Sequence, residues 1–221
     1  NDNRRKDDGV IASLYRINPA KLNTNLNFDK ILYPGGLTKC SVDGHPRAMS
    51  MAIMKNGNKQ ELYVLNAYRR SSVSNSYSYH PHLHRWTLNG TSIESHKEWV
   101  VCKNVTDNKE SEIVYNGKCY EIVNQTTTIV PGIYNDLWIA QRRVSPDANP
   151  CLMHLKIDAN DKLICDFIIV VNADGKESIN KNLLKINGQG ACPKAALALS
   201  ADGSMLALGS NGYINVLDIT Y

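Results

Sequence analysis

A short histidine-rich stretch is the part of this sequence best suited to chemistry. It reads Tyr79-His80-Pro81-His82-Leu83-His84, with an imidazole at every second position. If the stretch is a β-strand, residues two apart lie on the same face, so His80, His82 and His84 line up. Imidazole nitrogens are common zinc and copper ligands, and a further ligand from elsewhere would complete a metal site. The candidates for that further ligand are His45, His96, Asp43 and Glu94.

The alternative interpretation of these histidines is structural. In it, His80 and Pro81 lie in a loop, while His82 and His84 occupy one side of an ordinary strand. We favour this interpretation because the sequence fixes no distance to a third ligand. The metal site is therefore a hypothesis that a structure has to test.

A second candidate site is the segment just before the histidines, which combines aromatic, basic and small polar residues. Arg69, Arg70, Tyr77 and Tyr79 lie among serines and an asparagine, in an apparent insertion between two strands. Tyrosine and arginine anchor many protein interfaces, and serine and asparagine supply adaptable hydrogen bonds. The composition predicts a loop that binds a protein partner; a solvated loop is the alternative.

The signals for catalysis are weak. The sequence has no Gly-x-Ser-x-Gly nucleophile elbow, and its glycine pairs at 35–36 and 188–190 lack the Lys-Ser/Thr of a phosphate-binding loop. The carboxylates available to a glycosidase are Asp136, Asp147, Asp166 and Glu177. Acidic residues of this chain fall mostly in turns, where their usual role is to form the turn. We therefore expect a protein that is not an enzyme and holds no cofactor.

Composition excludes some partners and leaves the compartment open. The net charge of +4 is too small to predict a nucleic-acid partner. No apolar run approaches the ~18 residues of a membrane-spanning helix, and the chain opens without a recognisable signal peptide. None of the six cysteines forms a CxxC pair, which argues against a structural zinc site. A chain this long needs no disulfides to hold its core, so we expect free thiols in the cytoplasm. If the protein is instead secreted or associated with the endoplasmic reticulum, the sequons at Asn89, Asn104 and Asn124 would carry glycans.

The elements that position these residues are strands. Short apolar, β-branched and aromatic runs alternate with clusters of Gly, Asn, Asp and Pro, and no amphipathic helical periodicity is evident. The clearest segment is the last, where Ala195–Ser200, Met205–Gly209 and Tyr213–Ile219 are joined by Asp202-Gly203 and Asn211-Gly212. Asp-Gly and Asn-Gly supply the positive φ angles of two-residue hairpins. The segment predicts a three-stranded antiparallel meander.

This last segment resembles the three inner strands of a WD-repeat blade. In that family two small-residue strands flank an Asp-Gly turn, and a third strand ends in Trp-Asp or a variant of it. Here Leu217-Asp218 stands in the Trp-Asp place. Similar third strands end at Ile17, Leu88 and Ile157, at intervals longer than the ~40–45 residues of a minimal blade.

The resemblance implies an all-β fold in which residues 1–221 form a single β-propeller domain, or a fragment of one, with about three blades of antiparallel meanders. Beyond the last meander, the predicted strands are 13–17, 28–32, 47–53, 61–68, 82–88, 93–100, 125–133, 136–142, 151–157 and 163–171. Propellers close with about four to eight blades and leave no long free edge. We therefore expect another chain or copy to complete a larger propeller. A β-sandwich with long loops is the alternative fold.

The function that this fold implies is a protein–protein interaction module, scaffold or regulator. A propeller-based hydrolase or a carbohydrate-binding secreted protein is an alternative. Asp7–Ile17 also resembles the strand that follows a glycine-rich loop in the endoplasmic-reticulum exchange factor for Sar-type GTPases, the prolactin regulatory element-binding protein group. The loop itself is not present here. That likeness would imply guanine-nucleotide exchange through protein contact.

Overall fold

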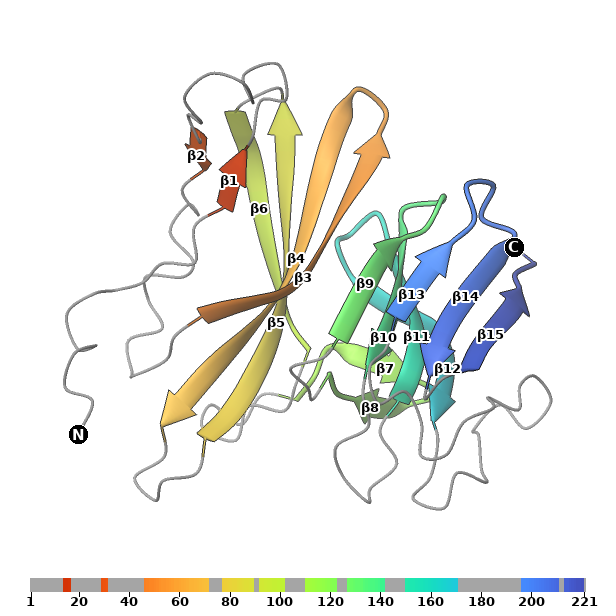
Figure 1. The fold of residues 1–221 in the computed structure, drawn as a ribbon. Helices are drawn as coiled ribbons and strands as arrows, with labels where there is room; N and C mark the ends of the chain where they lie inside the picture. The colour runs from red at the N-terminus through yellow and green to blue at the C-terminus, as the bar shows by residue number, and fades with distance from the viewer. Residues whose placement is uncertain are drawn as a thin grey trace.

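The fold is made of β-strands alone in the part of the chain that the computed structural model describes. That part comprises residues 14–16, 29–31, 46–71, 77–89, 92–101, 110–122, 127–141, 150–170, 196–210 and 213–220. Three sheets of consecutive strands and two short hairpins make up the described residues (Figure 1), and all the pairings are antiparallel. No sheet of these strands closes on itself. The prediction of an all-β antiparallel fold is confirmed.

The first sheet contains the histidine-rich stretch. Its strands are β3 (Pro46–Asn56), β4 (Lys59–Ser71), β5 (Tyr77–Asn89) and β6 (Ser92–Val100), and they neighbour one another in that order. The β3–β4 turn is tight because Gly57 takes a φ of 59°, which residues with a Cβ adopt only at a cost.

The second sheet repeats this order of consecutive neighbours. Its strands are β9 (Thr127–Pro131), β10 (Asp136–Gln141), β11 (Pro150–Ile157) and β12 (Leu163–Val170). Its turns place Asn135 and Asp161 at positive φ angles of 57° and 59°. Asn and Asp tolerate this region better than other residues with side chains, so the sequence supplies suitable residues at both turns.

The third sheet is the predicted C-terminal meander, with strands β13 (Ala196–Leu199), β14 (Met205–Ser210) and β15 (Tyr213–Asp218). In the β13–β14 turn, Gly203 has a φ of 75°, and the Asp202 carboxylate accepts hydrogen bonds from the hydroxyls of Ser200 and Ser204. These bonds hold the pKa of Asp202 at about 2, so the carboxylate stays charged.

Two short hairpins complete the described residues. Strand β1 (Leu14–Arg16) pairs with β2 (Asp29–Ile31), inside two predicted strands. The hairpin of β7 (Ile113–Tyr115) and β8 (Lys118–Tyr120) was not predicted. Its turn is an Asn-Gly pair, Asn116 and Gly117, with φ angles of 49° and 74°. Both positive angles are those of the two-residue turns that suit hairpins.

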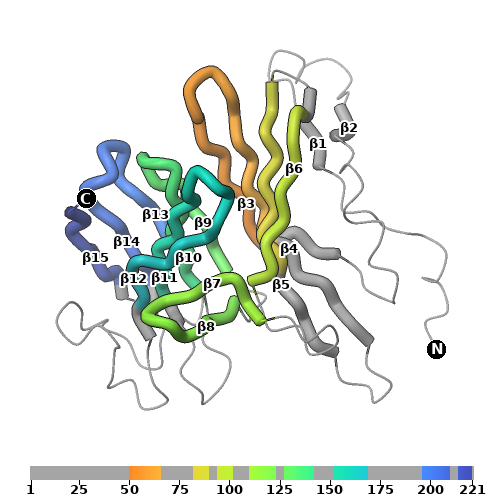
Figure 2. Tube along the Cα trace, turned by 180° about the vertical axis from the view of Figure 1, so that it is seen from behind, coloured from red at the N-terminus to blue at the C-terminus, as the bar shows by residue number. Residues whose placement is uncertain are grey.

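The three sheets lie one beside the next, with the second between the first and the third (Figures 1 and 2). Their first strands are neighbours: β9 lies beside both β3 and β13. Ser50 of β3 fixes this arrangement, since its hydroxyl accepts a hydrogen bond of 3.0 Å from the Ile129 amide of β9. No helix in the described ranges is long and apolar enough to cross a membrane.

Two apolar clusters hold the sheets together, one on each face of the middle sheet. The cluster between the first and second sheets includes Tyr63, Leu65, Trp99, Leu137 and Met153. The cluster between the second and third sheets joins Trp138, Ala140 and Leu152 to Leu206, Leu208 and Leu217. Alternate residues of each middle strand therefore point to opposite neighbours, as period-two alternation requires.

Candidate functional site

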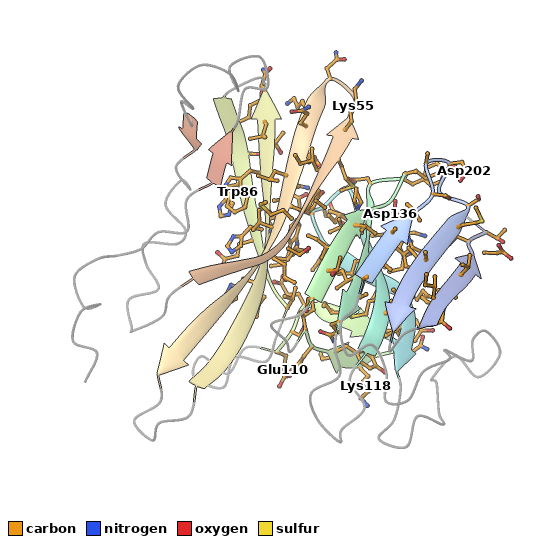
Figure 3. All side chains as sticks on the ribbon, in the orientation of Figure 1. Lys55, Trp86, Glu110, Lys118, Asp136 and Asp202 are labelled. Carbon is orange, nitrogen blue, oxygen red and sulfur yellow. The ribbon has the colours of Figure 1, made fainter. Side chains whose placement is uncertain are left out.

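Strands β5 and β6 gather three imidazoles, a carboxylate and an indole on one face of the first sheet. His84 lies opposite Glu98, and Trp86 lies opposite His96, with His82 one step further along β5. We call His82, His84, His96, Glu98 and Trp86 the imidazole cluster. Figure 3 shows Trp86 on the side of this sheet that faces away from the second sheet.

The side chains of the imidazole cluster form a stack linked by hydrogen bonds. The rings of His84 and His96 are nearly parallel with centroids 5.3 Å apart, and their Nδ1 and Nε2 atoms are 3.0 Å apart. Trp86 stacks on both imidazoles, at 5.2 Å from His84 and 4.8 Å from His96. At the other end, His82 Nδ1 hydrogen-bonds the Glu98 carboxylate. The cluster is therefore a continuous contact across the β5–β6 pair.

Burial disfavours positive charge in this cluster. His84 has 0% of its surface exposed, and the loss of hydration lowers its pKa to about 4, with the nearby imidazoles acting in the same direction against Glu98. Burial also lowers the pKa of His96. Burial alone would raise the pKa of Glu98, but the hydrogen bond from His82 and the nearby imidazoles bring it below its usual value. At neutral pH the cluster combines neutral His84 and His96 with an ionised Glu98.

The structure brings only part of the predicted metal set together. His82 and His84 share a face as predicted, with ring centroids 6.3 Å apart, and His96 joins them from β6. Within the described residues, no group of three or more His, Cys, Asp or Glu side chains could hold a metal ion. The side chain of His80 lies outside the described residues, as does all of His45 and Asp43, and Glu94 bonds to Asn89 and Lys59. The His80–His82–His84 metal site stays a prediction.

The predicted partner-binding residues lie on paired strand ends. Arg69 of β4 is directly opposite Tyr79 of β5, and Ser71 is opposite Tyr77. Arg70 therefore lies between them, opposite Ser78. The β4–β5 hairpin therefore extends into residues that were predicted to form a loop. The described structure covers only the backbone of these four residues, so their binding role stays a prediction.

A second polar cluster, missed in the sequence, lies in the middle sheet. His154 of β11 is held between two carboxylates: its Nε2 is 2.6 Å from Asp136 Oδ2, and its Nδ1 is 2.7 Å from Asp166 Oδ1. Lys156 adds an ion pair of 2.5 Å to Asp166, and the Trp138 ring stacks on His154 at 4.3 Å. The sequence singles out Asp136 and Asp166 only as carboxylates available to a glycosidase.

The Asp136 side chain is positioned by its own turn. It is 0% exposed, and its Oδ1 accepts a 2.7 Å hydrogen bond from the Tyr134 amide. Burial alone would raise its pKa, but the hydrogen bonds from His154 and the Tyr134 amide hold the pKa below its usual value. Gly132 leaves room for the carboxylate, because a Cβ there would lie 1.9 Å from Asp136 Oδ2.

The geometry of this second cluster suits it to bonding neighbouring strands to one another rather than to catalysis. Both ring nitrogens of His154 contact carboxylates, so neither is available to take a proton from a nucleophile. The buried thiol of Cys165 on β12 has its pKa raised to about 12 by burial, which keeps it protonated and unreactive. The carboxylates and the imidazole instead bond β10, β11 and β12 to one another.

The outer face of the third sheet is largely apolar and exposed, although the exposed Asp218 lies on it opposite Met205. Ile214 and Val216 of β15 are 77% and 59% exposed, and Met205 of β14 is 47% exposed. The register places Ala207 opposite Val216 and Gly209 opposite Ile214, so these residues share one face. We call Met205, Ile214 and Val216 the β14–β15 patch. The opposite face of the same sheet carries Leu206, Leu208 and Leu217, which are buried against the middle sheet.

A smaller exposed apolar pair lies on the first sheet. Met51 and Ile53 of β3 are 54% and 59% exposed, and we call them the β3 patch. They lie opposite Val64 and Leu62, on the face away from the middle sheet. The two patches thus lie on the outward faces of the two outer sheets.

Of the predicted glycosylation sites, Asn89 is the one that the described residues include. It ends β5, and its side-chain amide donates a 2.9 Å hydrogen bond to Glu94. Glu94 in turn pairs with Lys59 at 2.6 Å, so the amide is part of a hairpin contact. Asn104 and Asn124 lie outside the described residues. Glycosylation stays a prediction for all three.

Comparison with protein-family models, with curated proteins and with solved structures found no match to this chain. The WD-repeat resemblance and the fainter likeness to the GTPase exchange factor therefore stay predictions.

Proposed function

We propose that this chain is a protein–protein interaction module whose sheets stack in the manner of propeller blades, and that its binding surface is the β14–β15 patch. The observation that carries the proposal is the exposure of Ile214, at 77%, beside Val216 and Met205 on one sheet face. Contiguous exposed apolar surface of this kind marks interaction sites on soluble proteins.

The packing of the sheets within the chain indicates that the partner presents an apolar sheet face. The middle sheet has both faces covered by apolar contacts, one to each neighbour. The outer sheets use apolar residues on their inner faces for the same contact and carry further apolar residues on their outer faces. A partner that presents an apolar sheet face would continue the same stacking, and aligned sheets pack with about 10 Å between them.

The partner we propose is a second copy of the chain. Its β3 patch, Met51 and Ile53, is an exposed apolar area on the outer face of the first sheet, which the β14–β15 patch would cover. Contact between two different patches is head-to-tail, so it closes into a ring if the rotation allows and extends into a chain of copies if it does not.

The test is the solution mass of purified protein across a concentration series, measured by sedimentation velocity. The wild-type protein is expected to self-associate. Ile214→Glu and Ile53→Glu are each expected to weaken association at least ~10-fold, because a charge would be buried at the contact. Ile164→Glu is the matched control, since Ile164 is 43% exposed on β12 and belongs to neither patch.

Mixing the two variants tests the head-to-tail geometry. Ile214→Glu retains a wild-type β3 patch and Ile53→Glu retains a wild-type β14–β15 patch, so the mixture is expected to form a two-copy complex. A monomer at every concentration would overturn the second copy as partner. Association that Ile164→Glu weakens as much as Ile214→Glu would overturn the patch as the binding surface.

A further inference from the structure

We propose that the imidazole cluster is a pH-sensitive latch that joins β6 to β5 at neutral pH and weakens on acidification below about pH 6. This proposal is independent of the proposed binding function. It rests on the geometry of the His84–His96 contact, on the groups that surround it and on the position of β6 in the sheet.

The His84–His96 contact accommodates a single proton. Nδ1 of one ring and Nε2 of the other are 3.0 Å apart, so one nitrogen must donate a hydrogen while the other accepts it. If both rings were imidazolium ions, two N–H groups would point at each other across this distance, and two positive charges would be stacked. The contact is therefore compatible with neutral imidazoles and incompatible with two charged ones.

Among the described residues, one carboxylate and three imidazoles, His84 included, meet at this position. The described titratable groups that face it are His82 on its own strand and His96 and Glu98 on β6. On β4, the neighbours on this face are the apolar Leu62 and Val64, which are buried. Glu98 already accepts a hydrogen bond from His82, so this carboxylate is shared between His82 and His84.

The direction of the pH effect follows from the burial of His84. Its pKa is lowered from 6.5 to about 4, so the folded state binds its proton less readily than the unfolded chain does. The stabilisation is complete above about pH 6.5 and is lost as the pH falls from there toward about 4. The lowered pKa of His96 acts in the same direction.

Release of β6 would also weaken a contact with the second sheet. Within the described sheet, β6 is the edge strand and pairs only with β5. Its opposite face carries Trp99, whose Nε1 donates a 2.8 Å hydrogen bond to the Asp161 carbonyl in the β11–β12 turn. A weaker β5–β6 pair therefore weakens one contact between the first and second sheets, so acidification would first loosen the outer edge of the first sheet.

The test combines amide hydrogen exchange with histidine nuclear magnetic resonance on the intact chain, from about pH 7.5 to about pH 5. After correction for the intrinsic pH dependence of exchange, protection of the β5–β6 segment is expected to fall on the order of tenfold, as a single lowered histidine pKa requires. Protection of β10 and β11 is expected to change much less. His84→Gln is expected to flatten the pH dependence of β5–β6, whatever its effect on the protection at neutral pH.

The control is Ser95→Ala, an exposed position on β6 outside the imidazole cluster, which is expected to retain the wild-type pH dependence. In the wild-type protein, resonances of His84 and His96 are expected to remain those of neutral rings at pH values where exposed histidines are already charged. The proposal is overturned if both rings take up protons near pH 6.5 without a change in β5–β6 exchange. It is also overturned if His84→Gln retains the full pH dependence.

Discussion

At the scale of single residues, the Asp136 carboxylate is a buried charge that bonds neighbouring strands of the middle sheet. It is fully buried and bonded to His154, so Asp136→Asn would leave the imidazole beside a neutral partner. We expect a loss of about 3 kcal/mol of unfolding free energy near pH 7, the usual effect of breaking a buried pair. Asp166→Asn, at a half-exposed carboxylate, is expected to cost about 1 kcal/mol or less. Urea denaturation measures both, and equal losses would contradict the argument.

Asp136 also makes stability depend on pH. The fold favours the charged form of Asp136, whereas it favours the neutral form of His84. The pKa of Asp136 lies below its usual value of 3.8, so the folded state holds it ionised more strongly than the unfolded chain does. This stabilisation is complete above about pH 4 and is lost as the pH falls below it. Asp136→Asn is therefore expected to flatten the pH dependence of unfolding free energy below about pH 4, measured by urea denaturation at successive pH values. An unchanged acid limb in the variant would show that other carboxylates dominate it.

The lack of a Cβ at Gly132 leaves the space that the Asp136 carboxylate occupies. An alanine Cβ there would lie 1.9 Å from Asp136 Oδ2, so Gly132→Ala is expected to destabilise the wild-type protein by roughly 1–3 kcal/mol, by displacing the side chain. In an Asp136→Ala background the obstruction is gone, and the same change is expected to be nearly neutral. A double-mutant cycle by chemical denaturation measures this coupling. Additive losses would place the cost in the backbone instead.

At the scale of elements, the β11–β12 turn connects the middle sheet to the first. Asp161 accepts a 2.8 Å hydrogen bond from the Trp99 indole at its carbonyl and pairs with Arg85 at 2.8 Å through its carboxylate. Trp99→Phe is expected to cost about 1–3 kcal/mol because it leaves that carbonyl without the indole donor. Asp161→Asn retains the carbonyl and tolerates the positive φ, so it is expected to cost about 1 kcal/mol or less. A larger loss for Asp161→Asn in thermal or urea unfolding would reverse this order.

The elements were largely predictable, because the signals for strands and turns are local. Asp202-Gly203 predicted a hairpin turn, and Gly203 has a positive φ, but the connection from Leu199 to Met205 is longer than the predicted two-residue turn. The β7–β8 hairpin was missed although Asn116-Gly117 is a similar signal, because its strands are only three residues long. The polar clusters were not predictable in the same way. His154 meets Asp136 and Asp166 across sequence separations of 18 and 12 residues, and only the pairing register brings such residues together.

The His84–His96 contact shows why register mattered for the candidate site as well. Period-two alternation placed His82 and His84 on one face, and the structure confirms it. His96 was one of several possible partners, and its position depends on the irregularity in the β5–β6 register between Thr87 and Leu88. Such an irregularity shifts which side chains meet and leaves no distinct signal in composition.

At the scale of the whole molecule, two neighbouring residues of β11 take part in different contacts between the sheets. Leu152 belongs to the cluster shared with the third sheet, and Met153 belongs to the cluster shared with the first. Both are fully buried, so each substitution to alanine is expected to cost about 2–5 kcal/mol in total unfolding free energy. The costs are similar, but the regions that loosen should differ.

Amide hydrogen exchange distinguishes them. Leu152→Ala is expected to reduce protection mainly in β13–β15, and Met153→Ala mainly in β3–β6, because each cavity lies against a different neighbour. Each variant is the matched control of the other, since the altered positions are adjacent on one strand. Equal loss of protection in all three sheets for both variants would mean that the sheets unfold as one cooperative unit. Selective loss would mean that each interface is an independent contact, as the repeated face-to-face stacking of the sheets implies.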